Sequence, residues 1–323
     1  MKKRLLSGIQ PSGTMHIGNY FGAIRQFVDL QDQYDASIFV ADLHALTTVQ
    51  NKEILSKYIL NVVLDYLACG LDPKKVTLFK QSDLPQVTEL AWYFNTITTM
   101  AFLERATSYK DAHMKAKDVT VGLFDYPLLM AADILIQDAD VVPVGADQKQ
   151  HVEYARDTAQ KFNNIYGESF KLPEPIILQD VAIVPGTDGR KMSKSYGNTI
   201  PLFGTDEEIK KAVMSIVTDS KSPNESKDPE SCNIFALHKL FLNNDELENL
   251  RKRYLDGGLG YKESKEMLLS EILEKITPMR NKREEYAKDI EKVKEILKDG
   301  AQKANLQAKV KMEIIRGSIG LNI

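Results

Sequence analysis

Two patterns of apolar and polar positions divide the chain near residue 205. Before it, short runs of β-branched residues alternate with segments of helical periodicity, and after it almost every segment has the periodicity of an amphipathic helix. Buried strands are predicted at 37–41, 76–79 and 141–144. Strands that alternate with helices form βαβ units, so the first half should be an α/β domain with a mostly parallel sheet. The second half should be all-helical.

Capping residues predict where several helices begin and end. Asn51 precedes a periodic segment that Gly70 follows, so a helix is expected over about residues 52–69. Thr205 and Glu208 have the spacing of a capping box at the start of the helical half. Further along, breaks are expected where glycine or proline interrupts the pattern, at Gly257 and Gly258, Pro278, Gly300 and Gly317.

Composition and charge limit the possible classes of protein. A length of 323 residues suggests roughly two domains, and the net charge of -3 does not indicate a DNA-binding protein, so any nucleic-acid contact must be local. The only cysteines are Cys69 and Cys232, which argues against a disulfide scaffold and fits a reducing compartment. The basic start lacks an apolar signal region, and no stretch has the length of a membrane span. We therefore predict a cytoplasmic protein that does not associate with membranes.

The first candidate site lies near the start of the chain, over residues 5–19. A short strand enters a turn that contains Gly8, Pro11 and Gly13, and a helix follows. The free N–H groups and the dipole at a helix start attract phosphate, to which His16 could also donate a hydrogen bond. Gly18 would let a flat purine approach the backbone. The alternative is an ordinary strand-to-helix connection with a surface histidine, and no P-loop sequence is present.

A second candidate site lies in the segment 185–198, which turn formers flank on both sides. The segment is therefore predicted to be an exposed loop. Lys191 and Lys194 stand three residues apart and Ser193 and Ser195 accompany them, so ammonium and hydroxyl donors are concentrated there. Taken alone, such a cluster is more often a solvated basic loop than a binding site.

Taken together, the two segments resemble the signature motifs of class I aminoacyl-tRNA synthetases. Lys191 to Ser195 matches the second motif throughout, and His16 to Asn19 departs from the first only at Asn19, where many members have histidine. The tryptophan enzymes commonly carry asparagine there. Three longer segments, 8–13, 125–135 and 142–151, resemble the bacterial tryptophanyl-tRNA synthetases.

The resemblance implies a fold and a division into domains. The expected fold is a Rossmann-like catalytic domain over residues 1–205, with a helical insertion near 85–135. A helical domain that binds the tRNA anticodon should follow over residues 206–323, and its last helix could pack back on the catalytic domain. Within it, the basic spots 251–253 and 280–283 are candidates for contact with tRNA, or simply solvated helix faces.

The resemblance also implies the residues of the ATP site. His16, Lys191 and Lys194 would be catalytic. The two lysines would draw negative charge toward the pyrophosphate that leaves, and Lys110 would add a third cation. Mg²⁺ is implied by the chemistry of ATP, although no carboxylate cage is visible in the sequence and no metal ligand is assigned. The full set expected at ATP is Gln10, Pro11, Ser12, His16, Gly18, Asn19, Lys110, Gly145, Ala146, Asp147, Ile183, Lys191, Met192, Ser193, Lys194 and Ser195.

The pocket for the amino acid is expected on the segment 125–135. Tyr126, Met130 and Asp133 share one face of a helix there. A carboxylate that faces a core needs a partner, and the indole of tryptophan offers one N–H donor and no acceptor. The resemblance implies that Asp133 accepts this hydrogen bond. The set expected at tryptophan is Asp133, Tyr126, Met130, His44 and Gln148.

The implied function is that of an ATP-dependent tryptophan–tRNA ligase. L-tryptophan and ATP would form tryptophanyl-adenylate and pyrophosphate, and tRNA(Trp) would then accept the acyl group. The resemblance also implies a homodimer. The nearest alternative is a tyrosyl-tRNA synthetase of the same subclass. A small-molecule adenylyltransferase is a second alternative, but it would not need the helical half. A non-catalytic paralogue is a third, and the presence of both lysines argues against it.

Overall fold

The computed structural model describes residues 2–106, 109–110, 119–145, 149–177 and 184–322. Its centre is a parallel sheet with the strand order β3-β2-β1-β4-β5. The predicted strands correspond to β2, β3 and β4, and β1 and β5 complete the sheet. The α/β, Rossmann-like fold expected from the sequence is therefore confirmed. The strands are β1 Arg4–Ile9, β2 Asp35–Val40, β3 Val76–Lys80, β4 Val141–Val144 and β5 Glu174–Ile177.

The sheet reverses its direction of growth between β1 and β4. From β1 the chain adds β2 and then β3 on one side, and it later adds β4 and β5 on the other. In open α/β sheets, ligands bind outside the carboxyl ends of the strands at such a switch point. Both candidate sites should therefore be sought where β1 and β4 end.

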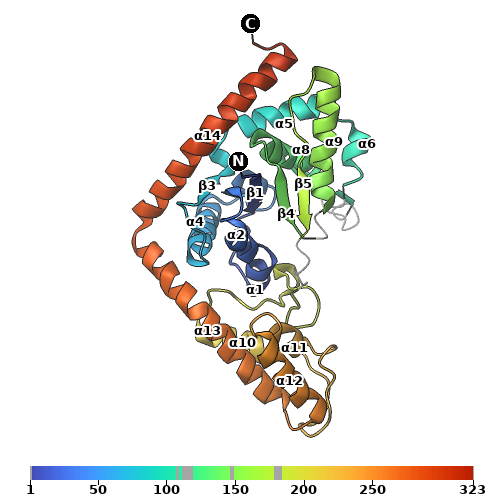
Figure 1. Ribbon diagram of the computed structural model, residues 1–323, viewed down its shortest axis with the longest axis vertical. Helices are drawn as coiled ribbons and strands as arrows, with labels where there is room; N and C mark the ends of the chain where they lie inside the picture. Colours follow the sequence, from blue (N-terminus) through green and yellow to red (C-terminus); the bar gives the residue numbers. More distant parts are fainter. Residues whose placement is uncertain (1, 107–108, 111–118, 146–148, 178–183, 323) are drawn as a thin grey trace.

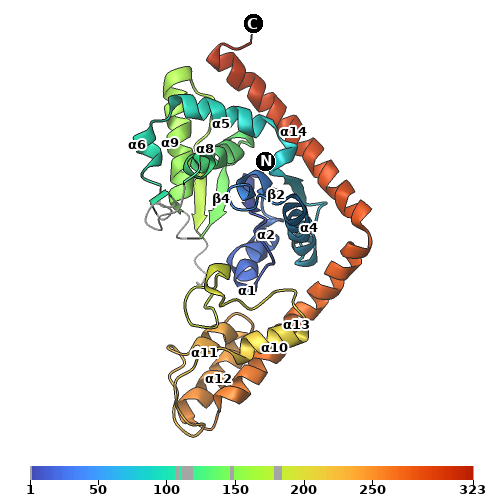
Figure 2. The same cartoon turned by 180° about the vertical axis from the view of Figure 1, so that it is seen from behind.

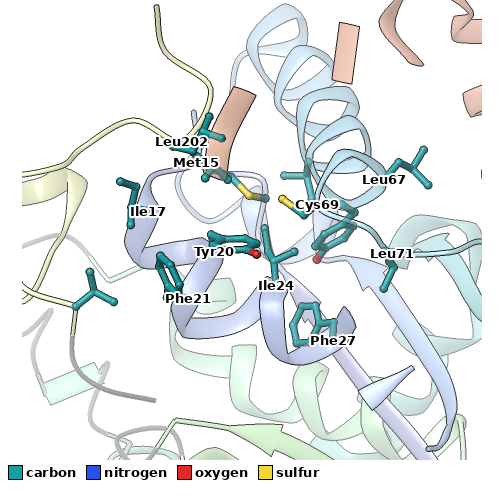
Figure 3. Packing of buried hydrophobic residues seen from close by; sticks show 14 of the residues in the cluster. Met15, Ile17, Tyr20, Phe21, Ile24, Phe27, Leu67, Cys69, Leu71 and Leu202 are labelled. Atoms are coloured by element: carbon teal, nitrogen blue, oxygen red, sulfur yellow. The ribbon is translucent and has the colours of Figure 1, made fainter. Parts of the chain in front are cut away.

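A continuous helical segment leaves the carboxyl end of β1. It consists of α1 Ile17–Asn19, the π-helical turn η1 Tyr20–Ile24 and α2 Arg25–Leu30. Its apolar side packs against Leu67, Cys69 and Leu71, and Leu202, from beyond the second motif, lies in the same cluster (Figure 3). The hydrophobic core thus already joins the two halves of the proposed ATP site.

Helices cover the remaining faces of the sheet. α4 begins directly after Asn51, whose side chain accepts the N–H of Ile54 over 2.9 Å, so the predicted N-cap is confirmed. Between β3 and β4, α8 packs against both α5 and α6. The elements that the structure describes in this half include α3 Asp42–Ala45, α4 Lys52–Ala68, α5 Gln86–Ile97, α6 Met100–Leu103, α8 Val121–Ile136 and α9 Lys149–Tyr166, with a short 3-10 turn η2 Gln81–Asp83.

The helical half begins at Thr205, whose side chain and that of Glu208 form the predicted capping box. α12 ends at Gly257, where φ is +81°, as expected. The two last helices are long and form an arm along one side of the sheet domain (Figures 1 and 2). The helices are α10 Asp206–Met214, α11 Asn233–His238, α12 Asn244–Asp256, α13 Tyr261–Lys288 and α14 Ile290–Ile319.

Three of the predicted helix breaks are wrong. α13 continues through Pro278, and α14 continues through Gly300 and Gly317. Pro278 is exposed and removes only one backbone hydrogen bond from a long helix. Gly300 is required by packing, because a Cβ there would lie 1.8 Å from the carbonyl oxygen of Leu78 in β3. The actual break falls at Asp289, between α13 and α14.

α14 lies across the sheet domain and covers the edge strand β3 (Figure 1). Its buried Lys311 donates to Asp138 Oδ1 and to the carbonyl oxygen of Ser169, each over 2.5 Å. Further along, Arg316 forms a bidentate pair with Glu89 on α5. The helix therefore protects an edge that would otherwise be open to pairing with another strand. Among the residues that the structure describes, no helix has the length and apolar character needed to cross a membrane.

Candidate active site

The first motif shares backbone hydrogen bonds with the segment that follows the second motif. The N–H of Ile17 donates to the carbonyl oxygen of Ile200, and the N–H of Leu202 donates to that of Met15, each over 3.0 Å. His16 and Pro201 form the antiparallel bridge between these two bonds. The segment that follows the second motif is thereby fixed to the helix start of the first.

Gly18 lies at the contact between the motifs. A Cβ on this residue would lie 2.9 Å from His16 Nδ1 and 3.3 Å from the Cβ of Met192. The first distance is too short for real atoms, so the His16 ring occupies its position only because residue 18 lacks a side chain. Space for the histidine ring is a reason for this glycine that differs from the approach of a purine, which stays a prediction.

His16 is buried at the N-terminus of α1, and 7 % of its surface is exposed. Burial, and to a smaller extent the charge of Lys194, lower its pKa to about 4, so the ring is neutral near pH 7. Its Nδ1 is buried and has no hydrogen-bond partner within the described part of the chain. A buried polar atom without a partner is costly, which fits a group that a ligand would satisfy. The side chain of Asn19, which was expected at the nucleotide, accepts the backbone N–H of His16 over 3.1 Å and thereby caps the helix start.

Lys194 extends toward the turn of the first motif. Its ammonium nitrogen lies 3.5 Å from the position that a Cβ on Gly13 would take. The protein around it lowers the pKa of this lysine by desolvation, and the charge of Asp65 opposes that effect. Gly13 has a φ of +121°, a conformation that favours glycine. The turn therefore combines exposed backbone, a neutral histidine and a lysine, which is a suitable environment for phosphate.

The loop that carries the second motif is organised around Asn198, which is buried. Its Oδ1 accepts the N–H of Ser193 over 2.8 Å, and its Nδ2 donates to Asp188 Oδ1 over 2.6 Å and to the carbonyl oxygen of Lys191 over 3.2 Å. The Ser193 and Ser195 hydroxyls lie 2.9 Å apart. One asparagine side chain thus determines the path of the motif. This role was not predicted from the sequence, because a lone asparagine after a glycine is typical of a turn.

An apolar cavity of about 280 Å³ lies at the switch point, where β1 and β4 end. Gly8, Phe39 and Val142 contribute to its walls, and Met130 and Asp133 of α8, two residues expected at tryptophan, also line it. Gly145, expected at the ribose, also borders it. The cavity combines apolar walls with one buried carboxylate, which are the features expected for a flat aromatic ligand with a single donor.

Asp133 has the partners that its burial requires. Gln81 Nε2 donates to both of its oxygens, over 3.0 and 2.8 Å, and His44 Nε2 lies 3.1 Å from Oδ2. Burial raises the pKa of Asp133, and the hydrogen bonds from His44 and Gln81 oppose this. A carboxylate offers about four acceptor positions, so one remains for an additional donor.

Gln81 is a site residue that the sequence analysis missed. It is fully buried directly after β3, and its Oε1 accepts the backbone N–H groups of Leu43 and His44 over 3.0 and 3.2 Å. It therefore connects Asp133 to the helix start at α3. Its position at the carboxyl end of a parallel strand is the signal that could have identified it.

The other predicted residues divide into four groups. Tyr126 lies by the pocket, with its hydroxyl 2.9 Å from His151 Nε2 and its ring 6.0 Å from that of His44. Gln10 reaches the carbonyl oxygen of His44 over 3.2 Å, and Pro11 and Ser12 follow it in the same turn. Lys110 is exposed, and no contact joins it to either motif within the described residues. Predicted residues that lie outside the described ones are Ala146, Asp147, Gln148 and Ile183.

Comparison with known proteins agrees with this geometry. The family model of the class I tRNA synthetases (W and Y) matches residues 1–277, and the chain belongs to that family. A tryptophan–tRNA ligase of Fusobacterium nucleatum is 54% identical over 99% of this chain and 98% of its own length. One from Rhodopirellula baltica is 49% identical over 98% of this chain and 99% of its own. Within the family, the chain therefore groups with the bacterial tryptophanyl enzymes.

The arrangement of the whole chain is also found in a solved relative. The crystal structure of tryptophanyl-tRNA synthetase from Campylobacter jejuni, complexed with ADP and tryptophan, has a TM-score of 0.92. It is 47% identical and covers 98% of this chain and 100% of its own. The resemblance to tryptophanyl enzymes expected from the sequence is thereby confirmed.

Proposed function

We propose that the described site activates L-tryptophan with ATP, forming tryptophanyl-adenylate and pyrophosphate, and then transfers tryptophan to tRNA(Trp). Family membership supports the activity, which is that of a tryptophan–tRNA ligase with ATP as substrate. The observation that carries the assignment to this site is the joining of the two motifs beside a cavity that contains Asp133. A tyrosyl enzyme is not favoured, since relatives at 54% and 49% identity are tryptophan enzymes.

The ATP phosphates would lie at the turn between β1 and α1. There the neutral His16 would use its unpartnered Nδ1, and the start of the helix would contribute N–H groups. Lys194 and Lys191 would stabilise the charge that develops on the leaving pyrophosphate. Such electrostatic stabilisation and positioning are the main requirements of nucleotidyl transfer. Met192, Ser193 and Ser195 would follow the loop toward the nucleotide, and Lys110 stays a candidate for a third cation.

The indole of tryptophan would occupy the cavity with its N–H directed at Asp133. Met130 and the apolar walls would contact the ring, and Tyr126 and His44 would close the side of the slot. Phenylalanine has no donor, so it would leave the buried carboxylate without the added bond; sites of this kind reject such analogues by roughly 10⁴–10⁵. The carboxylate of tryptophan would then attack the α-phosphate, and no covalent enzyme intermediate is needed.

Several finer assignments belong to this proposal. The described residues include no cluster of three acidic, histidine or cysteine side chains that could hold a metal, so Mg²⁺ would arrive on the phosphates of ATP. Residues 206–323 would read the anticodon, with 251–253 and 280–283 as contact candidates. Residues 1–205 would hold the catalytic site. We also propose that the enzyme works as a homodimer in the cytoplasm.

Tryptophan-dependent exchange of pyrophosphate into ATP tests the first step. Exchange should require tryptophan, and tyrosine and phenylalanine should not replace it. Charging of total tRNA with labelled tryptophan tests the second step. Exchange with tyrosine alone would contradict the proposal. Lys194→Ala should slow exchange far more than it weakens tryptophan binding by calorimetry, and equal losses would count against the role of the loop.

A further inference from the structure

Asp65 is a buried acid outside the two motifs, with 3 % of its surface exposed. It lies on α4, and its Oδ1 accepts from Arg283 Nε of α13 over 2.5 Å. Arg283 also donates to Asn61 Oδ1 over 2.9 Å, and its guanidinium lies 5.4 Å from the centre of the Phe203 ring. One arginine of the C-terminal arm therefore contacts both α4 and the segment just beyond the second motif.

The same face of α4 approaches Lys194. Tyr58, Asn61 and Asp65 stand at spacings of three and four residues, so they form one row on the helix. The Tyr58 hydroxyl and the Lys194 ammonium converge on Gly13, at 3.8 and 3.5 Å from the position of a Cβ there. Lys194 thus lies near the Tyr58 end of this row, and Arg283 is bonded to its other two members.

The charges along this row act on one another. Burial raises the pKa of Asp65 to about 6, and the charges of Arg283 and, to a smaller extent, Lys194 oppose that rise. Burial also lowers the pKa of Lys194, and the charge of Asp65 opposes that effect. A buried carboxylate remains charged only when cations and hydrogen bonds compensate its lost hydration. Arg283 provides a direct hydrogen-bonded partner that favours the ionised form, so the group on this side of α4 is a carboxylate and not a neutral acid.

We propose that Asp65 is a positioning residue for adenylate formation: its carboxylate, held by Arg283, draws the Lys194 ammonium over the Gly13 turn. This inference rests on the proposed role of Lys194 at ATP. The position of a reacting lysine then depends on how α13 docks on α4. A shift of the C-terminal arm would loosen Lys194 without touching either motif, which links the domain proposed to bind tRNA to the activation step.

A double-mutant cycle tests the inference. Asp65→Asn keeps the shape and removes the charge, and it should lower kcat of ATP–pyrophosphate exchange about tenfold, which corresponds to 1.36 kcal/mol of barrier. KM for tryptophan should not change. In the Lys194→Ala background, the same change should alter kcat less than about twofold, because the effect acts through that lysine. Arg283→Gln should reproduce the loss, and Arg283→Lys should restore most of it.

Asp206→Asn is the matched control. It breaks another acid–arginine pair of α13, Arg280 Nη1 to Asp206 Oδ1 at 2.6 Å, which has no connection to Lys194. Exchange should then stay at the wild-type rate. Asp65→Asn with an unchanged kcat, or with the same loss whether or not Lys194 is present, would overturn the inference. A wild-type rate for Lys194→Ala alone would instead remove the proposed role of the loop, and the inference with it.

Discussion

The backbone N–H of Ile17 donates to the carbonyl oxygen of Ile200, so main-chain atoms join the first motif to the segment just beyond the second, although most of the sheet domain separates them in the chain. This bond, and its neighbour between Leu202 and Met15, do not depend on which side chains stand at the bridge. The side chains determine how closely the helix start of the first motif and the loop of the second approach each other. Gly18 is the position that limits this approach.

Gly18→Ala should therefore damage catalysis more than folding. Its methyl group would displace the His16 ring, which lies 2.9 Å from the Cβ position, and would crowd Met192. A misplacement of about 1 Å can cost on the order of 10² in rate, so we expect exchange to fall at least about tenfold. Steady-state exchange and thermal melting would measure the two effects.

The matched control is Gly122→Ala on α8, where no heavy atom lies within 4 Å of the new methyl group. It should leave exchange unchanged. Wild-type exchange in Gly18→Ala would show that the His16 ring position is not needed.

Asn198→Ala should loosen the loop that carries Lys191 and Lys194. It removes the acceptor for the Ser193 N–H and the donor to Asp188 and to the carbonyl oxygen of Lys191. We expect KM for ATP to rise roughly tenfold, while calorimetry shows unchanged tryptophan affinity, because three hydrogen bonds of about 0.5–1.5 kcal/mol each are lost. Asn198→Asp should be at least as harmful, since it sets a carboxylate against Asp188.

Asn163→Ala serves as its control. Asn163 makes a similar set of local bonds, to Phe170 and Ser169, at the end of α9 and away from the motifs. It should affect melting temperature without changing KM for ATP. If Asn198→Ala behaves in the same way, Asn198 has only a structural role.

Local signals predicted those elements whose ends are determined within a few residues. Asn51 and Thr205 cap the helices expected of them, and Gly257 ends α12. The helix break predicted at Gly300 was wrong. That glycine is needed where α14 packs against β3, a strand more than 200 residues earlier in the chain. A sequence pattern shows that a glycine is present and does not show which neighbour needs the space.

The residues of the candidate site also divide into those that local sequence predicted and those that depend on distant contacts. His16, Lys194 and Asp133 were predicted because they lie in long segments that resemble a family. Gln81 was missed, since its role depends on contacts with Asp133, 52 positions away, and with the start of α3. Partners of this kind become visible only when the sheet places the ends of different strands together.

Asp133→Asn should weaken tryptophan binding selectively. The change keeps the shape but replaces an anionic acceptor by an amide, so the indole N–H loses a bond to a charged group. Such bonds contribute about 1.5–3 kcal/mol, which corresponds to roughly 10- to 100-fold in Kd. Calorimetry with tryptophan and with ATP would separate the two ligands. Unchanged tryptophan affinity would remove Asp133 from the pocket.

Gln81→Met tests the support of that carboxylate. It removes both hydrogen bonds to Asp133 and leaves the N–H groups of Leu43 and His44 without their acceptor. The free energy of unfolding should fall by about 1–3 kcal/mol, and tryptophan should bind more weakly. Gln86→Met is the control, because Gln86 is similarly buried but bonds to Asn305 of α14. It should lower stability alone; equal tryptophan affinity in both variants would contradict the role of Gln81.

The burial of His16 predicts a pH dependence of stability. The pKa of His16 is about 4 in the folded protein and 6.5 in the unfolded chain. Between these pH values the unfolded chain therefore binds a proton at this residue and the folded chain does not. The contribution of this residue to the free energy of unfolding should therefore be complete above about pH 6.5 and should decline as the pH falls toward 4. In His16→Gln that contribution is absent, since glutamine does not titrate. Urea unfolding of both proteins at several pH values from 4.5 to 7.5 should show the wild type losing stability relative to His16→Gln as the pH falls, whereas parallel curves would mean that His16 is protonated as readily in the folded protein as in the unfolded chain.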